Sequence, residues 1–254
     1  MAIDRVVEEL AARAPRAGVF LDVDGTLAPI VARPELARIL PEVGLTLARL
    51  AGRLEVVAVI SGRPSEQVRE LVDVDGVVVV GTHGLEDEPP MRPEVLNEIE
   101  AAASAVGAWV ERKGAAAAVH FRALEDPEAA EAAATAPLAA IAATHELEIV
   151  PGKRILELTP AGMPRKGGAV ERIARERGLE AVLFAGDDVG DLDAFAALER
   201  LRSQGLWTCG VVARGDDTPP EVEAAADVIV DGPGAMATLL ASIADELDRR
   251  APAF

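Results

Sequence analysis

The chain has 254 residues, half of them apolar, so it can bury a large core and fits one α/β domain or a core with a smaller second domain. Its single cysteine, Cys209, excludes an internal disulfide framework and cysteine-based zinc sites, which favours a reducing, cytoplasmic location. The net charge of −18 and the lack of an apolar run of about 18 residues argue against nucleic acid and membranes as partners.

Short apolar runs alternate with amphipathic stretches along most of the chain. Runs of this length, rich in Val, Ile and Leu, are typical of strands that are covered on both faces. They lie at residues 18–23, 56–60, 77–80, 181–185, 210–212 and 228–230. Helices are predicted at residues 41–53, 64–71, 166–178, 191–204 and 235–249. This βα alternation predicts an α/β fold with a doubly wound, Rossmann-like parallel sheet.

The pattern changes between residues 88 and 160. A helix is predicted at 93–112, an alternating strand at 115–121 and an Ala-rich helix at 127–144. Two further strands, at 147–150 and 154–158, are joined by a predicted turn at Pro151-Gly152. We therefore predict a small α/β cap domain at 88–160, inserted into a core domain formed by 1–87 and 161–254.

Two aspartates, Asp22 and Asp24, stand at the end of the first predicted strand. Burying an ionised carboxylate in an apolar strand costs several kcal/mol unless a metal, a hydrogen-bond network or a reaction compensates. Strand periodicity puts both residues on one side of the strand at its carboxyl end, where open α/β sheets bind ligands. Taken alone, Asp24-Gly25 is also a common tight turn.

Hydroxyl and cationic side chains stand at the starts of two predicted helices. The run Ser61-Gly62-Arg63 follows the second strand, and its hydroxyl, backbone N–H groups and guanidinium would form a phosphate-sized cradle. An ordinary helix cap is the alternative there. Lys166 opens another helix, where a cation is electrostatically misplaced unless an anion lies beside it. A solvated surface lysine is the alternative at that position.

Four aspartates crowd into seven positions after the strand at 181–185: Asp187, Asp188, Asp191 and Asp193. Their mutual repulsion is costly without a divalent cation to offset it. Acidic capping of the next helix accounts for Asp191 and Asp193, but poorly for Asp187 and Asp188. Because ligands that are all oxygen favour magnesium over zinc, this run predicts a Mg²⁺ site.

In their order along the chain, these four segments resemble the motifs of the haloacid dehalogenase-like (HAD) phosphatases. The resemblance covers the whole chain and implies a Mg²⁺-dependent phosphatase with an aspartyl-phosphate intermediate on Asp22. Asp24 would protonate the leaving oxygen and then deprotonate water, while Ser61 and Lys166 would hold the phosphoryl group. The implied Mg²⁺ ligands are Asp22, Asp24 through its backbone carbonyl, Asp187 and Asp188, with Asp191 supporting them. The resemblance leaves open which acid of the run after residue 186 ligates the ion directly.

A narrower resemblance is to the trehalose-6-phosphate phosphatase family, carried by residues 20–30, 60–63, 81–86, 111–114, 119–122, 156–162 and 166–167. It implies hydrolysis of trehalose 6-phosphate, the last step of trehalose biosynthesis. A sugar phosphate is then the small-molecule partner, and the chain is expected to be a monomer or a weak homo-oligomer. The implied substrate-binding residues are Gly25, Thr26, Gly62 and Arg63, together with His83, Lys113, His120, Arg122 and Glu157, which would contact the sugar hydroxyls.

Each sugar contact has an alternative. His120 and Arg122 lie on an alternating run and can face solvent, and Glu157 can pair with Arg154 or Lys153. The chain also departs from the family at four positions, where Asn, Arg, Thr and Glu are common but this sequence has Thr82, Thr159, Gly190 and Leu192. None of these departures changes a reacting group. They leave undecided the fine geometry of the sugar and metal contacts.

Three other functions stay open. A related HAD sugar phosphatase, of the sucrose-phosphate or mannosyl-phosphoglycerate type, would share the same reacting groups. A phosphoacceptor receiver domain is also doubly wound, with acids, a hydroxyl residue and a lysine around an aspartate. The second aspartate at position 24 and the large insert favour turnover over signalling. A relative that only binds its ligand would not need every catalytic residue type that this sequence has.

Overall fold

The structure is a computed structural model that describes residues 2–84, 89–162 and 165–251. The chain forms two compact units. We call residues 1–30, 37–83 and 165–254 the core unit, and residues 31–36 and 84–164 the inserted unit.

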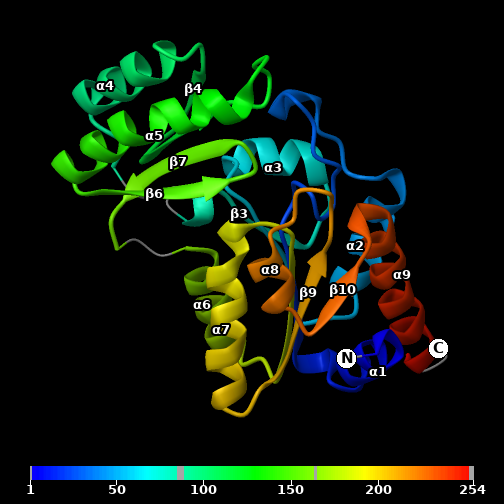
Figure 1. The fold of residues 1–254 in the computed structure, drawn as a ribbon. Helices are drawn as coiled ribbons and strands as arrows, with labels where there is room; N and C mark the ends of the chain where they lie inside the picture. The colour runs from blue at the N-terminus through cyan, green and yellow to red at the C-terminus, as the bar shows by residue number, and fades with distance from the viewer. Residues whose placement is uncertain (1, 85–88, 163–164, 252–254) are drawn as a thin grey trace. The chain divides into compact units, whose positions relative to one another are not determined.

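The core unit is built on a six-stranded sheet in the order β10-β9-β8-β1-β2-β3, with every neighbouring pair parallel (Figure 1). Its strands are β1 (Ala17–Leu21), β2 (Val56–Ile60), β3 (Val77–Val80), β8 (Ala181–Gly186), β9 (Trp207–Ala213) and β10 (Val228–Val230). Each lies at one of the predicted apolar runs. The α/β class with a doubly wound parallel sheet is therefore confirmed.

Helices cover both faces of this sheet, which explains why its strands are apolar at consecutive positions. Val19 and Leu21 of β1 pack in one cluster with apolar residues of α1, α2 and α9, while Phe20 packs on the opposite face with those of α6 and α7. Neither α1 nor α8 was predicted. The helices are α1 (Ile3–Ala12), α2 (Pro41–Ala51), α3 (Ser65–Val72), α6 (Lys166–Glu176), α7 (Leu192–Ser203), α8 (Pro220–Ala224) and α9 (Gly232–Arg250).

The inserted unit is a four-stranded antiparallel sheet in the order β4-β5-β7-β6 (Figure 1). One face packs against two helices, where Ile99 and Leu138 meet Val119 and Leu158 in a separate apolar core. Its elements are α4 (Pro93–Ser104), β4 (Trp109–Lys113), β5 (Ala116–His120), α5 (Pro127–Thr144), β6 (Leu147–Gly152) and β7 (Ile155–Pro160).

The helix predicted at 93–112 is wrong in its second half. The helix α4 ends at Ser104, and Gly107 then takes φ +77° while the N–H of Ala108 returns to the carbonyl of Ala103 at 3.0 Å. Glycine adopts this left-handed conformation without a Cβ clash, so it closes the helix. The following residues form β4, in which Glu111 pairs with Ala118 of β5.

The turn predicted at Pro151-Gly152 is also wrong. These two residues extend β6, with Gly152 opposite Ile155, and the chain reverses at Lys153 and Arg154, where Arg154 takes φ +60°. Because β6 is an edge strand, the missing N–H of Pro151 need not cost a ladder hydrogen bond. Strand pairing rather than local turn propensity therefore sets the position of this reversal.

Cys209 lies fully buried in β9. Burial, reinforced by the charge of Asp227, raises the pKa of its thiol to about 12, so the thiol stays protonated at neutral pH. Within the described ranges, no helix has both the length and the apolar character that a membrane span requires.

Candidate active site

Asp22, the first predicted acid, lies directly after β1 and just before a tight turn. The N–H of Asp22 donates to the carbonyl of Ala185 in β8 at 2.9 Å, which continues the strand ladder by one residue. The chain then turns, with the N–H of Ala28 returning to the carbonyl of Val23 and Gly25 at φ +90°. The Asp22 side chain is only 8% exposed. A carboxylate that is nearly shielded from solvent thus lies at the carboxyl edge of the sheet.

Lys166, the first residue of α6, places its ammonium between two carboxylates. Its Nζ lies 2.6 Å from Oδ1 of Asp22 and 2.6 Å from Oδ1 of Asp191, and the residue is buried. Burial lowers the pKa of Lys166, but the charges of Asp191 and Asp22 outweigh it and raise that pKa above its ordinary value. Lys166 is a buried, permanently charged link between β1 and the acidic run, not a solvated surface lysine.

The acidic run after β8 folds back on itself. Oδ2 of Asp191 accepts hydrogen bonds from the N–H groups of Asp187 at 2.9 Å and Asp188 at 3.1 Å, while its Oδ1 accepts from Lys166. Oδ1 of Asp188 accepts from the N–H of Val189 at 2.8 Å, as the cap of a 3-10 helix. Both oxygens of Asp191 are therefore occupied, and this side chain orients the residues before it.

Three buried carboxylates meet at one point. One oxygen each of Asp22, Asp187 and Asp191 lies within 4.8 Å of the other two. Burial raises the pKa of Asp22 to about 7, an effect that Lys166 opposes and Asp191 reinforces. A single lysine offsets only one of the three negative charges, and a divalent cation would offset the other two. Mg²⁺ holds oxygen ligands at about 2.0–2.1 Å in an octahedron, whose ligand-to-ligand spacings of about 3–4 Å fit this cluster.

Gly25 allows the β1 turn to approach Asp187. A Cβ at position 25 would lie 1.9 Å from Oδ2 of Asp187, well inside a van der Waals contact. The hydroxyl of Thr26 donates to the other oxygen, Oδ1, at 3.4 Å. Gly25 and Thr26, two of the predicted substrate-binding residues, thus both contact the Asp187 carboxylate region.

The loop after β2 holds the second predicted motif. The hydroxyl of Ser61, which is buried, accepts a hydrogen bond from the N–H of Arg63 at 3.2 Å. The guanidinium of Arg63 donates from Nε to Oδ2 of Asp24 at 2.6 Å and from Nη2 to Oδ1 at 2.7 Å. The cation that the sequence placed in a phosphate cradle is therefore joined to Asp24 by a two-point ion pair.

Thr82 is strained, and we expect Thr82→Asn to raise the free energy of unfolding by about 1 kcal/mol. Thr82 is buried at φ +46°, a left-handed conformation that β-branched residues avoid and asparagine tolerates. Urea unfolding measures the change, with Thr46→Asn in α2 as a control that should destabilise. A loss of stability in Thr82→Asn would show that the burial of the larger amide outweighs the relieved backbone.

The polar face of the inserted sheet carries three sugar-contact candidates. Nζ of Lys113 lies 3.6 Å from Oε2 of Glu157, and both residues are buried. Nε2 of His120 lies 3.0 Å from Oε2 of Glu111, and its ring stacks on Trp109 with the centroids 4.1 Å apart. His120 is 5% exposed, so the solvent-facing alternative for it is wrong.

Arg122 connects two backbone segments of the inserted unit. Its Nε donates to the carbonyl of Lys153 at 2.6 Å, and its Nη1 donates to the carbonyl of Val31 at 3.4 Å. These bonds tie the segment 31–36 to the reversal between β6 and β7. Arg154, one of the two alternative partners for Glu157, pairs with glutamates of α5.

Two residues of the polar face, Trp109 and Glu111, were not among the predicted site residues. They alternate with Lys113 along β4, and this alternation is the sequence signal that indicates a strand there, in conflict with the helix predicted at 93–112. The backbone of His83 lies in the 3-10 helix Thr82–Gly84, and its side chain falls outside what the structure describes.

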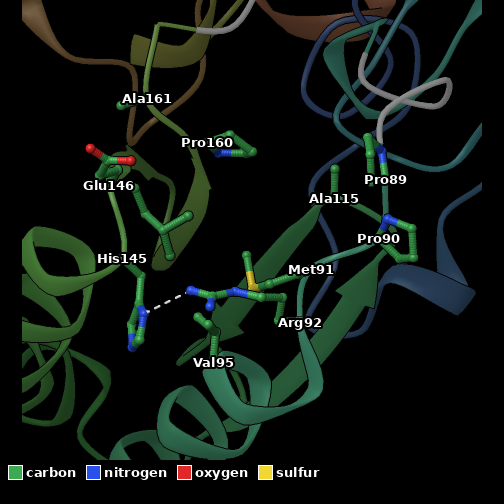
Figure 2. Close-up of a pocket in the computed structure, with 11 residues that line it drawn as sticks. Pro89, Pro90, Met91, Arg92, Val95, Ala115, His145, Glu146, Pro160 and Ala161 are labelled. Atoms are coloured by element: carbon green, nitrogen blue, oxygen red, sulfur yellow. Dashed lines mark hydrogen bonds between the residues drawn. The ribbon is translucent and has the colours of Figure 1, made fainter.

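The inserted unit also contains a cavity of about 510 Å³, shown in Figure 2. It lies where Pro89 and Pro90 enter the unit and Pro160 leaves it. Nη2 of Arg92 lies 3.2 Å from Nδ1 of His145 (Figure 2), whose Nε2 lies 3.1 Å from a carboxylate oxygen of α4. None of the residues predicted for the site is among those that line this cavity.

The sequence matches the trehalose-phosphatase family over residues 20–218. An uncharacterized glycosyl hydrolase of Mycobacterium tuberculosis is 35% identical over 72% of this chain, a match that covers 15% of that protein. A trehalose-phosphate phosphatase of Mycobacterium avium is 32% identical over 94% of this chain and 64% of the relative. The chain thus spans less than two thirds of the length of these curated relatives.

A similar solved structure is that of the C-terminal domain of a C. albicans trehalose-6-phosphate phosphatase, with a TM-score of 0.81. It is 21% identical, and the match covers 95% of this chain and 96% of that domain. At this identity the likeness establishes the fold alone, a parallel-sheet core with an inserted antiparallel sheet. Because the family match spans the carboxylate cluster, its lysine and the whole of the inserted unit, the chain belongs to the trehalose-phosphatase family.

Proposed function

We propose that the chain is a Mg²⁺-dependent phosphatase that hydrolyses trehalose 6-phosphate to trehalose and phosphate, the last step of trehalose biosynthesis. The observation that carries the proposal is the buried cluster of Asp22, Asp187 and Asp191 around Lys166, in a member of the trehalose-phosphatase family. The 32% identity to a trehalose-phosphate phosphatase over nearly the whole chain supports this choice of substrate.

In the first half of the reaction, Asp22 is the nucleophile. One of its carboxylate oxygens bonds to phosphorus, and the bond from phosphorus to the sugar oxygen breaks with its electron pair on that oxygen. The carboxyl group of Asp24 gives the leaving oxygen its proton. Lys166, hydrogen bonded to Oδ1 of Asp22, fixes the direction in which the nucleophile faces. The hydroxyl of Ser61 and the ammonium of Lys166 hold the phosphoryl oxygens.

The second half releases phosphate from Asp22. A water molecule attacks phosphorus while the carboxylate of Asp24 takes its proton, and the bond between phosphorus and the Asp22 oxygen breaks. The electron pair of that bond returns to Asp22, which becomes a carboxylate again. The net change is one phosphate monoester and one water converted to an alcohol and phosphate, with both aspartates restored.

The carboxylates of Asp22 and Asp187 and the backbone carbonyl of Asp24 would hold the Mg²⁺, with Asp188 as a further candidate. When bound, the ion offsets the negative charge that gathers around the phosphoryl group. Asp191 supports this set by holding the backbone N–H groups of Asp187 and Asp188. The close approach of the glycine turn to Asp187 supports this arrangement, since any larger residue would push the carboxylate aside.

The polar face of the inserted sheet supplies the groups that we propose for the sugar. Lys113, His120 and Glu157 come from three neighbouring strands, and His83 is the candidate from the core unit. A disaccharide presents many hydroxyls, and charged groups form the strongest hydrogen bonds to them. Arg122, which is held by two backbone carbonyls, suits a role in shaping this unit.

We expect Mg²⁺ to stabilise the folded chain, by about 2.7 kcal/mol at a concentration 100-fold above its dissociation constant. The physical reason is that the ion offsets repulsion among three buried carboxylates. Urea unfolding in EDTA and in Mg²⁺ measures the difference. Asp187→Asn should remove most of it, whereas Asp75→Asn, an exposed acid remote in sequence, should keep it. An equal shift in both variants would contradict a site at this cluster.

The substrate is tested by phosphate release from trehalose 6-phosphate, sucrose 6-phosphate, glucose 6-phosphate and mannosyl-3-phosphoglycerate with Mg²⁺. We expect trehalose 6-phosphate to give the highest kcat/KM by a wide margin. A flat profile would refute the substrate and leave the reaction class in place. A single equivalent of phosphate bound without turnover would instead favour a phosphoacceptor domain.

A further inference from the structure

The ion pair between Arg63 and Asp24 joins two motifs that the proposed reaction uses for different tasks. Arg63 belongs to the loop after β2, and Asp24 to the turn after β1, 39 residues earlier. The Arg63 side chain is 9% exposed and that of Asp24 28% exposed. A buried guanidinium needs a nearby anion, and both oxygens of Asp24 meet its planar fork.

The backbone of Arg63 is held as firmly as its side chain. Its N–H donates to the hydroxyl of Ser61 at 3.2 Å, and its carbonyl accepts from the N–H of Thr82 at 2.8 Å. The helix α3 begins two residues later, at Ser65. An arginine held at its N–H, at its carbonyl and along the Nε–Nη2 edge of its guanidinium has little freedom to move.

We propose that Arg63 is a positioning residue for Asp24, a role that rests on the proposed function of Asp24 as the group that protonates the leaving oxygen. An aspartate in a partly exposed turn can rotate about two side-chain bonds, and each rotation moves the reacting oxygen away. A two-point hydrogen bond to a planar guanidinium fixes the carboxylate plane, and each oxygen keeps a lone pair that faces away from Arg63. Proton transfer requires this kind of fixed geometry.

The test compares Arg63→Gln and Arg63→Lys with the wild-type chain on two kinds of substrate. The sugar phosphate needs its leaving oxygen protonated, whereas p-nitrophenyl phosphate releases a stable anion and does not. With Arg63→Gln we expect kcat/KM, which reports the steps up to departure of the leaving group, to fall about 10–100-fold on the sugar phosphate and less than about threefold on p-nitrophenyl phosphate. KM should change little, and Arg63→Lys, which keeps the charge without the fork, should lie between.

A phosphate-binding role for Arg63 predicts the opposite pattern. Both substrates would then lose kcat/KM to the same extent, and KM would rise for both, which would overturn the inference. Arg69→Gln in α3 is the matched control, because Arg69 is exposed on the same segment. Circular dichroism and thermal unfolding of each variant separate a folding defect from a change in rate, and Arg63→Lys provides a second variant if Arg63→Gln does not fold.

A double-mutant cycle completes the test. If Arg63 acts through Asp24, then adding Arg63→Gln to Asp24→Asn should cause no further loss on the sugar phosphate. Additive losses would overturn the inference. The measurements use whichever sugar phosphate of the panel the wild type cleaves best, so an error in the substrate leaves this test intact. A wild-type chain without phosphatase activity would overturn the proposed function and this inference together.

Discussion

Asp22→Asn is expected to lower phosphate release by at least about 10⁴-fold while leaving the fold intact. The amide has the shape of the carboxylate but does not act as the attacking oxygen. Folding should survive because the substitution removes a buried charge, and Lys166 keeps Asp191 as its partner. Phosphate release and thermal unfolding measure the two effects on the same preparations.

Asp75→Asn is the matched control, since Asp75 is exposed in the same unit and should keep full activity. Mass spectrometry of the purified variant excludes reversion of the amide by deamidation. Rapid quenching of the wild type should also trap a phosphorylated chain that is stable in acid and labile in base, as an acyl phosphate is, and Asp22→Asn should give none. Turnover by the variant at the wild-type rate would refute Asp22 as the nucleophile.

The same substitution should change how stability depends on pH in the metal-free chain. Burial raises the pKa of Asp22 to about 7, against about 3.9 in an unfolded chain. Between these values the folded state binds more protons, so this group lowers the free energy of unfolding as pH rises, and the loss is complete above about pH 7. Urea unfolding in EDTA should therefore show a shallower decline from about pH 4 to 7 in Asp22→Asn. Identical slopes would contradict the raised pKa.

Lys166→Met is expected to cost about 3–5 kcal/mol of unfolding free energy without Mg²⁺ and about 10²–10³-fold in kcat. Methionine keeps the length and the packing of the side chain but removes the cation. The carboxylates of Asp22 and Asp191 then lie buried without the charge that each meets at 2.6 Å. Mg²⁺ should restore part of the stability, because it supplies positive charge to the same cluster, but not the rate.

Lys153→Met is the control for this prediction. Lys153 is a half-buried lysine in the inserted unit, in the reversal between β6 and β7, and its loss should change stability by less than about 1 kcal/mol. Urea unfolding and phosphate release compare the two variants in parallel. A change of under 1 kcal/mol for Lys166→Met would show that the two buried carboxylates take up protons once the lysine is gone.

Local sequence was sufficient to predict an element where the hydrophobicity of its own residues decides whether it forms. The run Val56–Ile60 forms a strand because five apolar residues in a row suit a sheet that is covered on both faces. The helix predicted at 93–112 is wrong in its second half because its own residues do not decide the structure there. The residues after Gly107 follow a helix in the chain, but they pair with β5 and form a strand. Pairing between Glu111 and Ala118 is not visible in a local pattern.

The sequence by itself determined the α/β class, the order of the parallel strands along the chain and the presence of acids, a hydroxyl and a lysine at strand ends. These follow from hydrophobic periodicity and from the cost of burying charge, which act over a few residues. Only the tertiary structure decided three contacts. Both oxygens of Asp191 accept hydrogen bonds within the protein, Gly25 lies close to the Asp187 carboxylate, and the Arg63 guanidinium donates to Asp24. Such pairings depend on distances between segments far apart in the chain, which packing alone sets.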